Sequence, residues 1–98
     1  MANYRLTNLA VEDLASIWNY TFDNWSETQA DYYYQQLIES FEKIAKKPNS
    51  GKNYNGIAKD LFGFQVNRHI VFYRTMKSDE VEIARILHER MDLKSRLE

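Results

Sequence analysis

The sequence predicts an α+β fold in which an antiparallel two-helix hairpin packs on one face of an antiparallel sheet. Residues 8–45 carry apolar residues at the three-and-four spacing of amphipathic helices, and residues 61–88 are rich in aromatic and β-branched residues. The connector between the two helical stretches is short, which favours a hairpin. A chain of 98 residues holds one core, so we assign residues 1–98 to a single domain with the order β-α-α-β-β-β.

The first expected elements are a strand and a helix. Residues 4–7 read YRLT and form a strand candidate, and Thr7 is placed to cap the helix that follows over about residues 8–23. The apolar face of this helix is expected to consist of Ala10, Leu14, Ile17, Trp18, Phe22 and Trp25.

A second helix is expected to begin after Ser26, because Ser26 and Gln29 have the spacing of a capping box. Its apolar positions recur every three or four residues as far as Ile44, and Pro48 stops it. The expected inward residues are Ala30, Tyr33, Leu37, Phe41 and Ile44.

The remaining chain is expected to form a loop, three strands and a helical turn. Residues 49–60 are polar and glycine-containing, which is typical of a surface loop. Strands are expected at 61–68, 69–76 and 81–88, with a polar hairpin turn at 77–80. Residues 91–97 are expected to add a short C-terminal helical turn with Asp92 near its start.

Charge is unevenly distributed along the chain. Residues 1–42 carry one base and seven acids, whereas residues 43–98 carry twelve bases and seven acids. The two halves either meet partners of opposite charge or attract each other as an acidic helical layer and a basic sheet. The chain has no Cys, which excludes disulfides and thiolate chemistry, and no apolar run of about 20 residues. We therefore expect a cytoplasmic protein with no membrane partner.

Several segments together resemble the ParE branch of the RelE/ParE superfamily, the toxins of bacterial type II toxin-antitoxin modules. The resemblance is carried by residues 4–7 and 10–20, and most specifically by RHIVFYR at 68–74 and IARILHERMD at 83–92. The sequence departs from the family pattern at residues 52–67, which lack the arginine pair often found where the second strand begins.

The resemblance implies a ParD-like antitoxin as a partner and DNA gyrase as the target, poisoned by binding without bond-making chemistry. It also implies a role in plasmid stabilisation and a toxin-antitoxin hetero-oligomer, whereas exposed Trp or Tyr residues would equally suit a homodimer. We expect no cofactor and no metal site, since the chain has two His and no Cys. The isoelectric point is about 6.1, which is not that of a typical basic nucleic-acid-binding domain, so we expect no direct sequence-specific binding to nucleic acid.

The family ending identifies candidate target-binding residues. They are Arg85, His88, Arg90, Met91 and Asp92. A structural alternative is that Asp92 caps the last helical turn and that Arg90 pairs with it or with Glu89. Strand alternation places Arg85 with Ile83 and Leu87, on the face opposite His88, unless a bulge intervenes.

Aromatic and basic residues are the candidates for antitoxin binding, because large aromatics dominate interfaces and acidic antitoxin residues would be attracted to basic strands. They are Trp18, Trp25, Arg68, Tyr73 and Arg74. The two Trp residues are also explained as core or groove residues.

Two other functions remain open at this point. One is a RelE-like, ribosome-dependent messenger RNA endoribonuclease, which needs a base, an acid and cations within hydrogen-bond reach of one phosphate. Residues of the right types are Arg68, His69, Tyr73, Arg74, Arg85, His88, Glu89 and Arg90. The other is a non-toxic interaction domain of the same fold.

Overall fold

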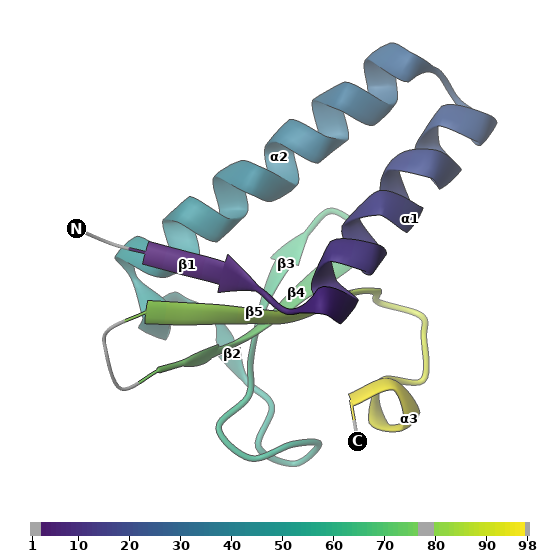
Figure 1. The fold of residues 1–98 in the computed structure, drawn as a ribbon. Helices are drawn as coiled ribbons and strands as arrows, with labels where there is room; N and C mark the ends of the chain where they lie inside the picture. The colour runs from purple at the N-terminus through teal and green to yellow at the C-terminus, as the bar shows by residue number, and fades with distance from the viewer. Residues whose placement is uncertain (1–2, 77–79, 98) are drawn as a thin grey trace.

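A mixed sheet with two long helices on one face forms the fold (Figure 1). The computed structural model describes residues 3–76 and 80–97. Its elements are β1 (Asn3–Leu6), α1 (Asn8–Asn24), α2 (Glu27–Lys46), the 3-10 turn η1 (Pro48–Ser50), β2 (Lys52–Asn53), β3 (Phe62–Val66), β4 (His69–Thr75), β5 (Glu80–His88) and α3 (Leu93–Leu97). The predicted α+β class, the helical hairpin and the short C-terminal helix are confirmed.

The order of the strands across the sheet is β1-β5-β4-β3-β2. Neighbouring strands are antiparallel except β1 and β5, which run parallel, so the sheet is mixed and not wholly antiparallel as expected. A parallel pair requires a long connection. Here that connection consists of the helical hairpin and the strands that follow it, which bring β5 back beside β1 (Figure 1).

A bulge in β5 changes which residues face the helices. Phe72 pairs with Arg85 and the next residue, Tyr73, pairs with Ile83, so that Ala84 is the extra residue. Ile83 and Ile86 consequently belong to the same core cluster. This corrects the expected alternation, which placed Ile83 with Arg85.

Both predicted helix caps are present. The Thr7 hydroxyl oxygen accepts a hydrogen bond from the backbone N–H of Ala10 at 3.0 Å, and the Ser26 hydroxyl oxygen accepts one from the N–H of Gln29 at 3.0 Å. Each bond satisfies one of the free donors in the first turn of a helix. The short Trp25–Ser26 connector therefore reverses the chain between two capped helices.

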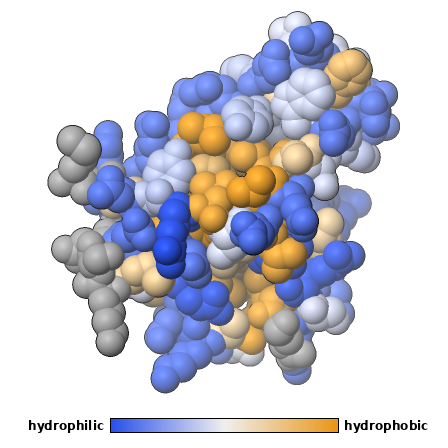
Figure 2. Space-filling model, in the orientation of Figure 1, coloured by the Kyte–Doolittle hydropathy of each residue, from blue (hydrophilic) through white to orange (hydrophobic). Residues whose placement is uncertain are grey.

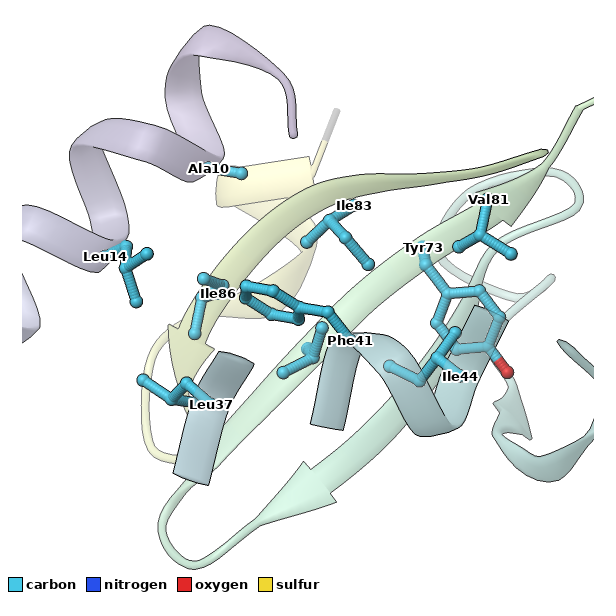
Figure 3. Close-up of a cluster of buried hydrophobic side chains, with 10 residues drawn as sticks. Ala10, Leu14, Leu37, Phe41, Ile44, Tyr73, Val81, Ile83 and Ile86 are labelled. Atoms are coloured by element: carbon cyan, nitrogen blue, oxygen red, sulfur yellow. The ribbon is translucent and has the colours of Figure 1, made fainter. Parts of the chain in front are cut away.

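The main core lies between the helical hairpin and the sheet (Figure 3). Its buried members are Ala10, Leu14, Leu37, Phe41, Ile44, Val71, Tyr73, Val81, Ile83 and Ile86. In the orientation of Figure 1, the apolar surface gathers between the two helices and β1, with hydrophilic side chains around it (Figure 2).

The last turn of α1 differs from its prediction. Phe22 and Trp25 are 43% and 75% exposed, and Thr21 is buried in their place. The reason is that the tip of the hairpin extends beyond the sheet, so that no strand lies beneath this turn (Figure 1).

A second, smaller apolar cluster contains Leu61, Ile70, Phe72 and Leu87. It is covered by side chains of the loop before β3 and of α3, namely Tyr54, Ala58, Leu93 and Leu97. The segment 49–60, expected to be a surface loop, contains the end of η1 and strand β2. Of the predicted turn at 77–80, residues 77–79 lie outside the described residues and Glu80 begins β5.

Candidate functional site

A groove of about 430 Å³ opens between the hairpin tip and the ends of the strands. We call it the histidine groove. Its lining comes from α1, α2, the β3–β4 turn, β4 and β5, and consists of Tyr20, Thr21, Trp25, Gln29, Tyr33, Asn67, Arg68, His69 and His88. The sheet therefore brings together residues that lie far apart in the sequence.

One wall of the histidine groove is a hydrogen-bonded chain from α2 to β4. The Tyr33 hydroxyl donates to the carbonyl oxygen of Val66 at 2.9 Å and lies 2.8 Å from Nδ1 of His69. Because the single hydroxyl proton is used on Val66, Nδ1 of His69 carries the proton that bonds Tyr33, and Nε2 of His69 is left as an acceptor.

Burial controls the protonation of this pair. It raises the pKa of Tyr33 to about 12 and, together with the nearby ring of His88, lowers the pKa of His69 from 6.5 to about 4. At neutral pH the His69 ring is therefore uncharged.

His88 stands directly opposite His69 in the β4–β5 register, with ring centroids 5.4 Å apart and an interplanar angle of 80°. Its Nδ1 accepts a hydrogen bond from the backbone N–H of Arg90 at 3.1 Å. In the neutral ring the proton is then on Nε2. The two neutral rings thus offer one acceptor, Nε2 of His69, and one donor, Nε2–H of His88.

This tautomer does not suit a metal ion, because binding at Nε2 of His88 would move the proton to Nδ1 and break the bond from Arg90. Across residues 3–76 and 80–97, no group of three or more His, Cys, Asp or Glu residues has the arrangement of a metal site. In the same residues, no helix is long and apolar enough to cross a membrane.

Arg68 lines the groove at its β3–β4 end and pairs with Glu89. The Arg68 guanidinium lies 3.2 Å from Oε2 of Glu89, and the amide nitrogen of Gln65 donates to Oε1 of Glu89 at 2.9 Å. The hydrogen bond from Arg68 lowers the pKa of Glu89. Glu89 is therefore paired with Arg68 and not with Arg90, the partner that the structural alternative allowed.

The candidate target-binding residues divide into two groups. Arg90, Met91 and Asp92 follow His88 in the turn between β5 and α3, and Met91 is 40% exposed. The Asp92 carboxylate accepts from the Ser95 hydroxyl at 2.8 Å and caps α3, which lowers the pKa of Asp92. This contact matches the capping role that the structural alternative gave Asp92.

Arg85 is separate from that group. Its Nε and Nη2 donate to the two carboxylate oxygens of Asp13 in α1, at 2.8 and 3.0 Å. The same carboxylate accepts from the backbone N–H of Ile86 at 3.0 Å. These bonds with Asp13 raise the pKa of Arg85. Asp13 is not among the site residues predicted from the sequence, although the sequence does show an acid directly beside the inward-facing Leu14.

The candidate antitoxin-binding residues do not form one surface. Trp25 and Arg68 line the histidine groove, whereas Trp18 lines a separate hollow of about 400 Å³ and donates through Nε1 to Asp31 at 3.0 Å. Arg74 lies on the opposite side of the sheet, where its Nε is 3.4 Å from the carbonyl oxygen of Lys59 in the loop.

The prediction that Tyr73 contacts the antitoxin is wrong, because the side chain of Tyr73 is fully buried in the main core (Figure 3). Its hydroxyl donates to the carbonyl of Pro48 at 2.6 Å and accepts from the N–H of Gly51 at 3.0 Å. Burial raises the pKa of Tyr73. Its tyrosine hydroxyl serves to anchor the segment after α2.

Comparison with known proteins gives matches along almost the whole chain. The family model for the ParE toxin of the type II toxin-antitoxin system, parDE, matches residues 4–93. The chain is 34% identical to Toxin ParE1 of Caulobacter vibrioides over 97 residues, covering 99% of each protein. It is 29% identical to Toxin ParE1 of Mycobacterium tuberculosis over 92 residues, covering 94% of each.

Two solved structures share the fold. One is the chromosomal ParDE toxin-antitoxin system from P. aeruginosa, with a TM-score of 0.76 and 19% identity, covering 90% of this chain and 96% of that chain. The other is the toxin-antitoxin complex RelBE2 from Mycobacterium tuberculosis, with a TM-score of 0.68 and 19% identity, covering 89% and 96%.

Proposed function

The chain belongs to the ParE toxin family of type II toxin-antitoxin systems, and from this premise we propose that it binds and poisons DNA gyrase and is neutralised by a ParD-like antitoxin. The observation that carries the proposal is the family match over residues 4–93. Poisoning by binding needs a shaped surface and no reacting side chain.

The placement of the basic residues supports a binding mode of action. Cleavage of a phosphodiester requires acid, base and cations within reach of one phosphate. Tyr73 is buried in the core, Arg85 is held by Asp13 in α1, and Arg74 lies on the other face of the sheet. Three of the eight residues suited to catalysis are therefore remote from the histidine groove.

The hairpin offers the kind of surface on which an antitoxin segment would dock. Tyr20 of α1 and Trp25 at the tip are 67% and 75% exposed, and both line the histidine groove. Large exposed apolar side chains of this kind serve as anchors in protein interfaces. The antitoxin would lay an extended or helical segment along them.

A second candidate is a RelE-like ribonuclease, because Arg68, His69 and His88 do line one groove. The neutral His69 would be the base, His88 the acid, and Arg68 the cation that stabilises charge on the phosphate.

The test is a supercoiling reaction with purified gyrase and this chain, scored for inhibition and for linearised plasmid, beside a translation reaction probed for cut messenger RNA. We expect trapped linear DNA and intact messenger. Arg90→Ala should weaken inhibition, whereas Lys94→Ala, which removes an exposed cation from the adjacent α3, should not. Cut messenger with unaffected gyrase would replace the proposal with the ribonuclease.

A further inference from the structure

The edge of β5 changes partner halfway along its length. Its first half pairs with β1 from Glu80 to Ile83. Beyond Ile83 there is no further strand residue in β1, and the N–H of Ile86 donates to Oδ2 of Asp13 at 3.0 Å. Beyond β1, Thr7 bonds the carbonyl oxygens of Ile83 and Ala84, and the Asp13 carboxylate on α1 takes the N–H of Ile86.

The same carboxylate fixes Arg85, and Arg85 fixes α3. Besides its two bonds to Asp13, Arg85 donates through Nη1 to the carbonyl oxygen of Arg96 at 3.2 Å. The Arg85 and Asp13 side chains are only 17% and 15% exposed. Arg85 thus joins α1, β5 and α3, and most of its donors are already used within the chain.

The loop of residues 88–92 lies between the two elements that this contact joins. Inside it, the N–H of Met91 donates to the carbonyl of His88 at 3.0 Å. Its start is fixed by the bond from the N–H of Glu89 to the carbonyl of Arg68 at 2.8 Å, and its end by α3. Arg90 and Met91 are exposed on the loop.

We propose that Asp13 and Arg85 are positioning residues that hold the loop of residues 88–92 as the surface that meets the target, with Arg90 and Met91 as the contacts. This inference rests on the proposed function, and it removes Arg85 from the direct contacts. The complementary surface on the target has a carboxylate for Arg90 next to an apolar recess for Met91. A loop fixed at both ends loses little conformational freedom on binding, which favours affinity.

The experiment combines NMR order parameters of the backbone amides with gyrase inhibition, measured for wild type, Asp13→Asn and Arg85→Lys. We expect order parameters in residues 90–96 to fall from about 0.85 to below about 0.6 in both variants. Inhibition should weaken about tenfold, as for the loss of preorganised contacts. Glu82→Gln is the matched control, because Glu82 forms an exposed ion pair with Arg5 on the same strand.

The amide of Val71 in the core reports whether each variant is folded, and Arg85→Lys is the milder change if Asp13→Asn unfolds the chain. Unchanged order parameters in both folded variants would overturn the positioning role. Weaker inhibition by Arg85→Lys with an unchanged loop would make Arg85 a direct contact instead. If wild type fails to inhibit gyrase, the target assignment falls with the proposed function, while the order parameters still decide whether the pair holds the loop.

Discussion

The packing around Gly63 in β3 leaves no room for a Cβ atom. A Cβ at this position would lie 2.6 Å from Cε1 of Tyr54 and 2.8 Å from Cγ2 of Ile70, closer than carbon atoms approach. The hydrogen atom of glycine is what allows Tyr54 to cover this part of the second apolar cluster.

We therefore expect Gly63→Ala to destabilise the protein by about 1–3 kcal/mol, as overpacked sites do. Gly56→Ala is the control, since nothing lies within 4 Å of a Cβ there. Urea denaturation of both variants measures the difference. Equal stability of the two would show that Tyr54 moves aside without loss.

The half-buried His69 makes stability depend on pH. In the folded protein the pKa of His69 is about 4, whereas in the unfolded chain it has the ordinary value of 6.5. Between these values the unfolded state binds the proton first, so the free energy of unfolding falls as pH is lowered from 6.5 to 4 and is fully retained above 6.5.

Allowing for partial screening of the ring by water, we expect this loss to be about 1 kcal/mol. His69→Asn keeps a donor for Tyr33 and removes the titration. Denaturation curves at several pH values should show a smaller loss for the variant than for wild type, and parallel curves would contradict the assignment. Acidic groups titrate in both proteins and cancel in the difference.

At the scale of the elements, the caps of the two helices are not equivalent. Within residues 3–76 and 80–97, the hydroxyl of Ser26 bonds locally to the N–H of Gln29, whereas the hydroxyl of Thr7 also donates to the carbonyl of Ala84 at 2.8 Å. The backbone N–H of Thr7 in addition donates to the carbonyl of Ile83 at 3.0 Å. Thr7 therefore joins α1 to β5 at the bulge.

We expect Ser26→Ala to cost about 1 kcal/mol, the usual value for a lost cap, and Thr7→Val to cost about twice as much because a second bond is lost. Thr7→Ser keeps the hydroxyl and should lie near wild type. Thermal unfolding followed by circular dichroism ranks the three variants. A Thr7→Val variant no weaker than Ser26→Ala would mean that the bond to Ala84 contributes nothing.

At the scale of the whole molecule, the apolar clusters on the two faces of the sheet contribute unequally to the stability of the fold. Phe41 is fully buried between the helices and the sheet, while Leu97 of α3 is only partly buried against the second cluster. The main core joins the helical hairpin to strands β4 and β5, and α3 is five residues long.

Phe41→Ala should consequently destabilise the whole fold by about 3–5 kcal/mol. Leu97→Ala should cost about 1 kcal/mol, in proportion to its partial burial. Amide exchange distinguishes the two, because Phe41→Ala should accelerate exchange throughout the sheet and Leu97→Ala only in α3. Faster exchange throughout the sheet in Leu97→Ala would show that α3 belongs to the main cooperative unit.

The sequence alone determined the parts of this protein that depend on neighbours along the chain. The caps at Thr7 and Ser26, the two amphipathic helices, their hairpin and the three consecutive strands all follow from bonds and periodicities within a few residues. The family resemblance was also contained in the sequence, in segments that later matched the ParE family model.

Only the tertiary structure decided the contacts between distant segments. Asp13 and Arg85 are 72 residues apart in sequence, and Tyr33 and His69 are 36 apart. The parallel pairing of β1 with β5, the bulge at Ala84 and the burial of Tyr73 likewise depend on how the hairpin returns over the sheet. Such contacts form only after both segments have been brought together, so no local periodicity encodes them.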